Sequence, residues 1–555
     1  MAKTRQYSFG LQPSVRYRRS KFTGLSHSHK TTANVGTLYP FLCEEIYPGD
    51  TFKVKTTFVS QVTSAFLKPV MDNVFIDMYY FFVPNRLVFK DWENVLGGAQ
   101  PNDWTAPEDV SVPVMRGGPV GSKTIADFFG LPVGDVPRGI NVLPFRGLAL
   151  IYDRWFRSQN VVDGMLVQTG AIGNNEVFNE GPWTSSNYTG LPPKVSKMHD
   201  YFTSCLPGTQ KGAPISVGLS GKAPLVTGDV YGLGGDMVLT NSGMPRPIGG
   251  YTVHNLVGVS TIGTDRNLRL LPPTSEDGLP SGSMTVNQSN LYANLNDASA
   301  ITVNELRYAF QTQRILEKLG LYGGRYNEYL LANFGVSAGD SRLQIPEYLG
   351  GHRVPLKIQQ ISQTSQPSED SPLGALGAFS TSSGSARFTK SFVEHGFVIG
   401  VFCLRQIHTY QQGIRKMWMR SERMDYYNPL LAHIGEQPVY QSEIYAIGKI
   451  DLKDNAFGYQ EPFAELRTHP SEVTGELRSN VDNSLDIWHF ADDYENAPVL
   501  SQAWLEETPA YVDRTLAVPS TMSDQFIIDF YHNISAYRVL PAYGTPGLID
   551  HDTTR

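Results

Sequence analysis

Side chains alternate between apolar and polar from Phe52 to Phe66, and this alternation constrains the fold more than any other feature of the chain. The apolar members share one parity: Phe52, Val54, Phe58, Val62 and Phe66. Polar members take the other: Lys53, Lys55, Thr57 and Gln61. A period of two is typical of a β-strand with one wet face. We therefore predict a strand that is covered on one side only.

A second strand is predicted after a turn. Proline and Asx side chains interrupt the alternation between Leu67 and Asn73, and both residue types favour turns. From Val74 to Val83 both parities are almost entirely apolar, so this strand is expected to be buried on most of both faces. We interpret the two stretches as antiparallel strands, and a second layer must cover the buried one.

The composition fits short strands joined by long ordered loops. Glycine (52 residues), proline (36) and aromatic residues (11%) are frequent, whereas charged residues make up 18%. No apolar run is long enough to span a bilayer and no signal peptide is evident, so we expect a soluble protein made in the cytoplasm. Cys43, Cys205 and Cys403 are interpreted as small buried residues rather than disulfide partners or metal ligands.

Later elements complete the fold prediction. Helices are expected from Pro144, from a capping box at Thr302 to Gly320, and over Arg325–Asn333. Strand-like stretches follow the same alternation or apolar character: Asp200–Leu206, Phe392–Ile407 and Gln525–His532. Strands of similar character near both ends predict an eight-stranded antiparallel jelly roll with long loop insertions and a few helices.

These patterns divide the chain into four segments. Residues 212–300 are polar and turn-rich, and an unstructured loop of that length is uncommon inside a compact domain. We therefore interpret them as a subdomain or surface projection. The predicted segments are a basic arm (1–43), the first part of the jelly roll with loop helices (44–211), the insertion (212–300), and the remaining strands with loops for subunit contacts (301–555).

The arm carries cations and no carboxylate. Residues 1–43 contain seven Lys or Arg and no Asp or Glu, which leaves −14 for the rest because the whole chain carries −7. Aromatic residues lie between these cations, and the mixture is typical of segments that bind single-stranded nucleic acid. A solvated tail, or a tail that binds a protein, fits equally well. The candidate contact residues are Lys3, Arg5, Arg16, Arg18, Arg19, Lys21 and Lys30.

Motifs for catalysis or metal binding are weak. Gly335–Gly339 has the G-x-S-x-G pattern of hydrolases, but a helix is predicted before it rather than a strand, so Gly335 is interpreted as a helix C-cap. The histidines lack metal-binding spacing, and the acidic run Asp492, Asp493, Glu495 is interpreted as a solvated face. No P-loop is present. We predict no catalytic residues, no metal and no cofactor.

Two longer segments of the chain have a distinctive sequence: Tyr80–Trp92 (YFFVPNRLVFKDW) and Leu143–Asn160 (LPFRGLALIYDRWFRSQN). Shorter distinctive segments follow in order: His199–Gly212, Pro346–Gly351, Glu394–Gly396, Thr409–Gly413, Ala432–Gln437, Phe457–Glu461, Leu485–His489 and Pro546–His551. Together these segments resemble the major capsid proteins of microviruses, which are small icosahedral bacteriophages with single-stranded DNA, and in particular the gokushovirus branch.

The resemblance implies a jelly roll of the viral capsid type and a virion protein assembled in the bacterial cytoplasm. It implies sixty copies, built through pentamers into a T=1 shell around circular single-stranded DNA. Implied partners are a small basic DNA-binding protein, scaffolding and pilot proteins, and a host receptor, without membrane insertion. In related gokushoviruses an insertion near residues 212–300 builds a protrusion at the three-fold axes, although this segment matches no family pattern. Asn428-Pro429-Leu430 also lacks an expected aromatic residue.

Tryptophans are candidate anchors between subunits, because interface energy concentrates in buried Trp, Tyr and Arg. Trp92, Trp155 and Trp418 are the candidates, and each fits a position in the core equally well. Two other classes stay open from sequence alone. A jelly-roll phage adhesin or carbohydrate-binding protein would have no need of a basic arm. A jelly-roll enzyme would require carboxylates or histidines that converge from distant segments.

The arm cannot neutralise a genome alone. Sixty copies with seven cations each supply about 420 positive charges, whereas DNA that encodes only these 555 residues has about 1665 phosphates. Small cations or a separate basic protein must supply the difference. We therefore expect the arm to position DNA, or that basic protein, on the inner surface of a shell.

Overall fold

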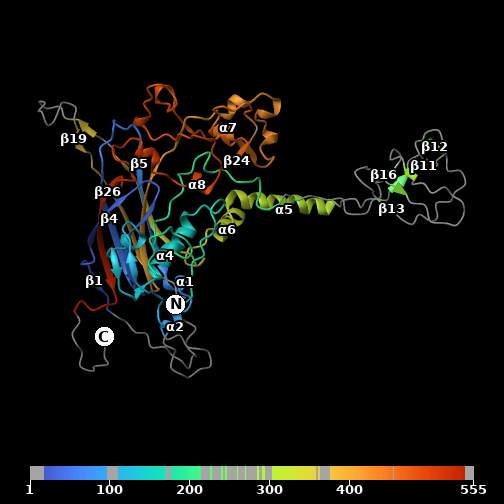
Figure 1. Ribbon diagram of the computed structural model, residues 1–555. Coiled ribbons are helices and arrows are strands. Elements are labelled where there is room, and N and C mark those ends of the chain that lie inside the picture. Colours follow the sequence, from blue (N-terminus) through green and yellow to red (C-terminus); the bar gives the residue numbers. More distant parts are fainter. Residues whose placement is uncertain are drawn as a thin grey trace, which may run out of the picture. The chain divides into compact units, whose positions relative to one another are not determined.

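The computed structural model describes residues 18–96, 110–170, 177–213, 215, 303–357, 381–453 and 455–543, with the backbone of short strands within 225–293 and 360–379. The chain forms two compact units. One comprises Met1–Lys211 and Glu317–Arg555, and the other is Gly212–Leu316. The first unit contains the two large sheets, which lie in the region labelled β4, β5 and β26 in Figure 1.

Strands that follow one another along the chain are distributed over both large sheets. The five-stranded sheet contains β1 (Ser20–Phe22), β2 (His27–Ala33), β26 (Phe526–Arg538), β4 (Thr51–Val62) and β20 (Ser382–Ser391), with β1 and β2 both paired to β26. The four-stranded sheet has the order β17 (Glu347–Leu356), β5 (Val74–Pro84), β21 (Gly396–Gln406) and β3 (Leu38–Ile46). All these pairings are antiparallel, so the predicted β-rich jelly-roll class is confirmed.

Strands β4 and β5 were predicted correctly as strands, but they do not pair with each other. β4 lies between β26 and β20, whereas β5 lies between β17 and β21 in the other sheet. The turn Leu67–Asn73 therefore lies in a connection that crosses from one sheet to the other. A hairpin interpretation is wrong because the partner of each strand comes from a distant part of the chain.

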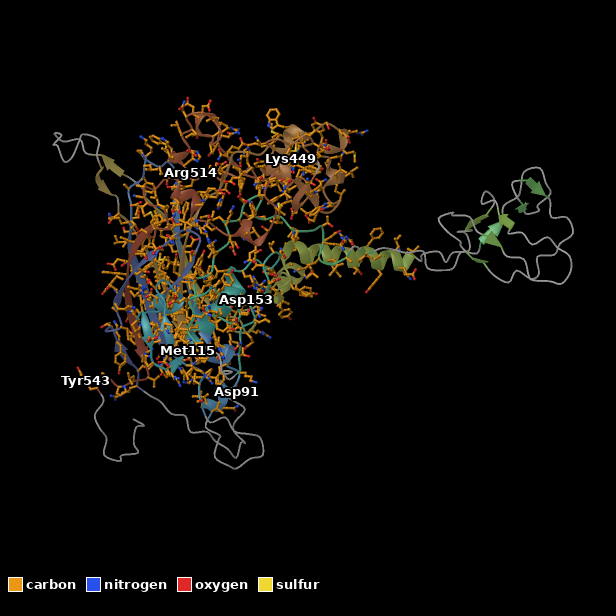
Figure 2. The ribbon with its side chains drawn as sticks, in the orientation of Figure 1. Asp91, Met115, Asp153, Lys449, Arg514 and Tyr543 are labelled. Carbon is orange, nitrogen blue, oxygen red and sulfur yellow. The ribbon has the colours of Figure 1, made fainter. Side chains whose placement is uncertain are left out.

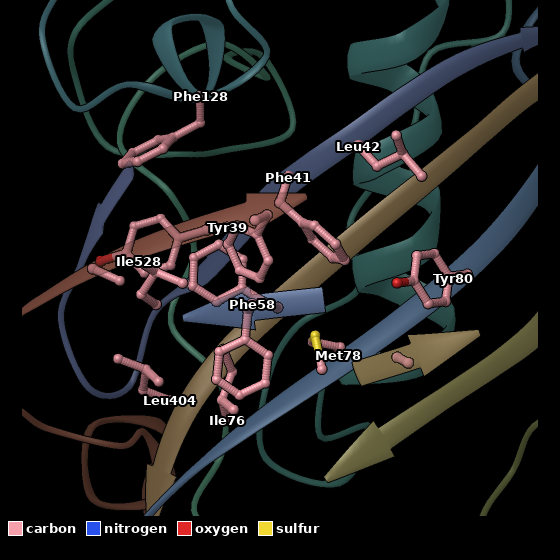
Figure 3. Packing of buried hydrophobic residues seen from close by; sticks show 14 of the residues in the cluster. Tyr39, Phe41, Leu42, Phe58, Ile76, Met78, Tyr80, Phe128, Leu404 and Ile528 are labelled. Carbon is pink, nitrogen blue, oxygen red and sulfur yellow. The ribbon is translucent and has the colours of Figure 1, made fainter. Parts of the chain in front are cut away.

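Aromatic side chains fill the space between the sheets. Phe41 of β3 stacks on Phe530 of β26 with ring centroids 4.7 Å apart, and Phe402 of β21 lies 5.0 Å from Phe530. All three side chains are at most 1% exposed. Figure 3 shows Phe41, Phe58 and Ile528 of this core beside Ile76 and Met78. The alternation of β4 arises here, since its even-numbered residues point into this cluster.

The outer face of the four-stranded sheet is also covered. Helix α4 (Leu143–Ile151) packs Leu148 and Ile151 into a second apolar cluster with Phe81 of β5. A Cβ at Gly147 would lie 3.0 Å from Ile399 Cδ1, so glycine permits the close approach of helix and sheet. Burial on both faces explains the continuous apolar sequence of β5, as predicted.

The expected boundary of the basic arm at residue 43 is wrong. β1, β2 and most of β3 precede it, and β2 pairs with β26 from His27 to Ala33. The arm prediction failed because β2 (HSHKTTA) is polar up to Ala33, so it lacks the apolar alternation by which a strand is recognised in sequence. The jelly roll therefore begins by Ser20 in the described chain.

The remaining helices are mostly short, apart from α5 (Val303–Tyr322) and α6 (Tyr326–Phe334). α6 ends at Gly335 with φ 65°, which confirms the predicted C-cap, whereas Thr302 lies outside the described residues. Asp200–Leu206 is a series of turns rather than a strand, because the Asp200 carboxylate accepts backbone bonds from Phe202 and Thr203. The short helices are α1 (Asn85–Val88), α2 (Trp92–Val95), α3 (Ile125–Phe128), α7 (Gln441–Ile444), α8 (Gln502–Leu505) and α9 (Ala510–Asp513).

Short two-stranded ladders support the loops of the first unit: β6 (Val114–Met115) with β9 (Ile140–Asn141), β7 (Gly118–Val120) with β8 (Gly134–Val136), β22 (Thr409–Tyr410) with β25 (Ser471–Glu472), and β23 (Gln437–Tyr440) with β24 (Ala456–Gln460). A further pair is β18 (Gln360–Ser362) with β19 (Leu376–Phe379). Strands between Leu225 and Ala293 form two small sheets: β10 (Leu225–Thr227), β11 (Leu239–Asn241), β12 (Met244–Arg246), β13 (Val259–Ser260), β14 (Arg269–Leu270), β15 (Met284–Val286) and β16 (Leu291–Ala293).

A buried ionic cluster fixes the C-terminal loops to the end of β21. His408 Nδ1 lies 2.7 Å from an Asp492 oxygen and its Nε2 lies 3.0 Å from Glu507, while Lys197 donates to Asp492 at 3.1 Å. Arg514, labelled in Figure 2, donates to the backbone oxygens of His489 and Ala491 just before Asp492. The interpretation of Asp492 as part of a solvated face is wrong, because partners distant in sequence bury it completely.

Replacing Phe530 with alanine tests the inter-sheet core. The substitution leaves a cavity beside Phe41 and Phe402, so the free energy of unfolding should fall by about 3–5 kcal/mol. Ile527→Ala is the matched control on the opposite, exposed face of β26 and should change it by about 0.5 kcal/mol or less. Urea unfolding of the unassembled subunit measures both, and equal losses would contradict the assignment of faces.

The ionic cluster predicts a loss of stability at alkaline pH. Burial alone would lower the pKa of His408, but Asp492 and Glu507 raise it to about 10. The folded pKa lies above the ordinary value of 6.5, so this stabilisation is complete below pH 6.5 and is lost as the pH rises toward about 10. His408→Gln should flatten this decline in urea unfolding across that range. Identical pH dependence in the parent and the variant would rule out the proposed linkage.

Candidate nucleic-acid interface

The five-stranded sheet leaves its outer face exposed, and that face is basic. Alternate residues of β4 and β20 point away from the core, including Lys53, Lys55 and Arg387. Lys21 of β1 and Lys30 of β2 are exposed on the neighbouring strands. We define the basic face by its outward side chains: Lys21, Lys30, Lys53, Lys55, Arg387, Asp529, Tyr531 and Tyr537.

Like charges lie directly opposite one another across this face. Arg387 of β20 pairs in register with Lys55 of β4, and Lys55 pairs on its other side with Asn533 of β26. Lys53 forms the next outward row with Thr389 and Ser535. Opposed like charges destabilise a sheet, so a bound polyanion would relieve this repulsion.

Aromatic rings and one carboxylate lie beside these cations, and the exposed apolar residues Val59 and Ile527 share the same outward parity. Tyr531 and Tyr537 are 50% and 44% exposed, and Lys21 Nζ lies 6.0 Å from the centroid of the Tyr537 ring. Asp529 is the one carboxylate, and it forms an ion pair with Lys30. Four cations therefore remain without an opposing carboxylate on this face of an otherwise acidic chain. Such cations next to exposed rings can contact phosphates and stack bases.

The core behind the basic face carries a neutral histidine. His532 of β26 is fully buried, and its Nδ1 lies 2.9 Å from the Thr56 hydroxyl. Burial, together with His27 and His29, lowers the pKa of His532 to about 3. The inward-facing side chain at this position is therefore uncharged at neutral pH. The outward-facing side chains of the same sheet include the cations of the basic face.

The predicted cations divide into three groups. Lys3, Arg5 and Arg16 lie outside the described residues, and Arg18 and Arg19 are exposed before β1. The other two, Lys21 and Lys30, belong to the basic face. Sequence reasoning did not identify Lys53, Lys55 or Arg387 as site residues. Two lysines on the wet parity of β4 were the available signal, but the pairing with Arg387 depends on the sheet.

The three candidate tryptophans occupy different environments. Trp92 is half-buried and packs edge-on to His395 with centroids 5.6 Å apart. Trp155 donates to the Pro346 carbonyl at 3.1 Å and is 37% exposed, whereas Trp418 is 71% exposed. Contacts within the same chain therefore bury much of the Trp92 and Trp155 side chains. A role for any of the three between subunits stays a prediction.

Among the described residues, no group of three or more His, Cys, Asp or Glu side chains is arranged to hold a metal ion. No described helix combines the length and apolarity required to cross a membrane. All three cysteines are free, and burial raises the pKa of Cys205 to about 12, so this thiol is unreactive at neutral pH.

Comparison with known proteins finds capsid proteins that match this chain over nearly its full length. The family described as "Capsid protein (F protein)" matches residues 12–548. The chain is 36% identical to capsid protein VP1 of Chlamydia phage 1, with 97% of both chains covered. It is 38% identical to capsid protein VP1 of Bdellovibrio phage phiMH2K, over 98% of this chain and 97% of the relative. Identity to capsid protein VP1 of Spiroplasma virus 4 is 37%, over 94% of both chains.

These matches decide between the classes that the sequence left open. An enzyme or an adhesin would not share a capsid family over almost its entire length, and a capsid protein self-assembles into the shell of a virion. The chain therefore belongs to the capsid protein (F protein) family of bacteriophages, as a structural, major capsid protein of the microvirus type.

Proposed function

We propose that sixty copies of this chain form a T=1 shell that packages circular single-stranded DNA, with the basic face turned toward the DNA. The observation that carries the proposal is the concentration of Lys21, Lys53, Lys55 and Arg387 on one open sheet face. A chain of net charge −7 gains little solubility from such a face. Contact with a polyanion gives these cations a role.

Single-stranded nucleic acid suits the geometry better than a duplex. Bases of a single strand are free to stack on Tyr531 and Tyr537, whereas duplex bases are already paired and stacked. A flat sheet face offers no protruding helix for a major groove. Binding of this kind depends on phosphates and ring faces, so it tolerates any sequence, as genome packaging requires.

Arg18 and Arg19 extend the same contact. They lie immediately before β1, whose Lys21 belongs to the basic face. The arm is therefore proposed to face the interior, where it positions DNA or a separate small basic protein. Counter-charge arithmetic supports such a protein, because the arms supply too few cations for the genome.

The insertion is proposed to meet the host surface. Gly212–Leu316 forms a compact unit apart from the jelly roll, and its sequence is rich in Gly, Ser, Thr, Asn and Pro. The strands described between Leu225 and Ala293 belong to neither large sheet, so this unit can vary without loss of the shell. Such independence suits a segment that selects a receptor.

Neutralising the basic face should weaken DNA binding and its salt dependence together. Each phosphate contact to a single strand contributes about 0.7 to the log–log salt slope, so K53Q/K55Q/R387Q should reduce that slope by about 2. Fluorescence anisotropy of the unassembled subunit with a single-stranded oligonucleotide measures the slope. Lys68→Gln is the control, as an exposed lysine outside the two large sheets. An unchanged slope in the triple variant would exclude this face.

Removing residues 212–300 should separate assembly from attachment. With a short Gly/Ser linker in their place, the jelly roll retains all strands of its two sheets and particles should still form. Electron microscopy measures particle formation, and adsorption to host cells measures attachment, which should be lost. Failure to form particles would argue that the insertion serves the shell instead, and full adsorption would argue against receptor contact.

A further inference from the structure

A polar cavity of about 270 Å³ lies on the outer side of the four-stranded sheet, where the end of α4 approaches the start of α6 (Figure 1). Residues 155–160, residues 196–203, the start of α6 and the end of β21 form most of its walls. The Arg, Lys, Asp and Glu side chains on these walls are four cations, Arg157, Lys197, Arg325 and Arg405, and one carboxylate, Glu328. The cavity therefore suits an anion if one of these cations is free to bind it.

A π-helix builds one wall of the cavity. α4 continues into the π-helix η2 (Tyr152–Phe156), which carries Trp155 on that wall. Arg325, at the N-terminus of α6, donates to the backbone oxygens of Asp153 and Arg157 at 2.7 and 3.2 Å, and Asp153 is labelled in Figure 2. A single π-helical turn is rare and is frequently found at functional sites. These bonds hold the wall in a fixed form.

Three of the four cations already have a partner within the chain. Arg157, Lys197 and Arg325 lie 2.8, 3.1 and 3.7 Å from a carboxylate oxygen, respectively. These three residues shape the cavity and add little free positive charge to it.

Arg405 is the exception. Ile399, Val401 and Cys403 of β21 pack into the apolar cluster on the outer face of the sheet, and Arg405 continues this row to the cavity. Its side chain is 15% exposed, and its Nε is buried without a hydrogen-bond partner among the described residues. A buried N–H group without an acceptor destabilises a folded protein, so such a group calls for a bound partner.

Asp77 does not satisfy Arg405. Its two oxygens accept bonds from Arg353 at 2.6 and 2.8 Å, whereas Arg405 Nε lies 3.9 Å away, beyond hydrogen-bond distance. The Tyr79 hydroxyl also donates to Asp77, at 3.3 Å. One carboxylate therefore faces two guanidinium groups, and a positive charge is left over at the end of the cavity.

We propose that this cavity binds a phosphate group through Arg405. The planar fork of a guanidinium matches the oxygens of a phosphate and can donate two parallel hydrogen bonds to it. Ser158, Asn160 and Ser196 line the same cavity and offer further polar contacts. Because the cavity is partly enclosed, these charge-assisted bonds are stronger than the same bonds in open water.

Trp155 separates two sources of this phosphate. Its ring lies on the cavity wall and is 37% exposed, and its Nε1 donates to the Pro346 carbonyl, which fixes the ring. Tyr348 packs beside it with centroids 5.8 Å apart and is 43% exposed. A nucleotide can place its base on these rings, whereas inorganic phosphate leaves them uncovered. The contact with Arg405 is the same in both cases.

This site goes beyond the proposed packaging function. Arg405 belongs to the four-stranded sheet, whereas the basic face belongs to the five-stranded sheet. The variant K53Q/K55Q/R387Q should therefore bind the phosphate group as the parent does. Phosphate binding can fail while DNA binding by the basic face stands, and the reverse also holds.

Isothermal titration calorimetry of the full-length chain with inorganic phosphate and with thymidine 5′-monophosphate tests the site. Arg405→Gln should weaken the binding of both ligands about tenfold or more, because hydrogen bonds to a charged group are lost. Ser158→Phe is a second variant, which fills the cavity without removing a charge and should weaken binding equally. Tighter binding of the nucleotide that Trp155→Leu abolishes would identify a nucleotide site, and equal affinities would identify a site for free phosphate.

Arg154→Gln is the matched control, because Arg154 is an exposed cation of the same π-helix and does not line the cavity. It should change the affinity about twofold or less, since solvent screens an exposed charge. Thermal melting monitored by circular dichroism checks folding, and Arg353 still pairs with Asp77 in Arg405→Gln. The proposal is overturned if the parent shows no saturable binding of either ligand. Binding as tight as that of the parent in a folded Arg405→Gln or Ser158→Phe variant would overturn it as well.

Discussion

Aromatic packing between the sheets is the constraint on which the rest of the structure depends. Phe41, Phe402 and Phe530 interlock across the sandwich and fix which parity of each strand points inward. A slip of one residue in β4 would bring Lys53 and Lys55 into this core, which desolvation forbids. The same packing that stabilises the subunit therefore holds the cations of the basic face in their rows.

The two sheets differ in what covers them, and this difference separates stability from function. The four-stranded sheet is buried on both faces, because α4 and its neighbouring loops close the outer one. The five-stranded sheet keeps one open face, whose cations have a destabilising arrangement in isolation. The apolar core behind that face offsets the destabilisation that the repulsion between these cations causes. Small ions or a bound polyanion would relieve repulsion between such exposed cations.

Local patterns predicted elements well and partners poorly. The alternation at Phe52 and the apolar run at Val74 each identified a strand, because burial on one or two faces is written in neighbouring residues. The pairing of β4 with β26 could not be predicted, since it joins segments from opposite ends of the chain. The prediction that Asp492 lies on a solvated face was wrong for the same reason. Its burial depends on Lys197, His408 and Glu507, whose convergence only the folded loops create.

Charge placement also explains how a chain of net −7 carries a basic surface. Cations are concentrated on the open face of the five-stranded sheet, where Arg387 lies directly opposite Lys55. A uniform distribution of the same charges would leave no basic surface, because carboxylates outnumber cations in the whole chain. The parity of β4 prevents this mixing, since its inward residues must be apolar for the core and only its outward positions can hold Lys53 and Lys55. The aromatic core therefore fixes both the fold and the rows in which these cations stand.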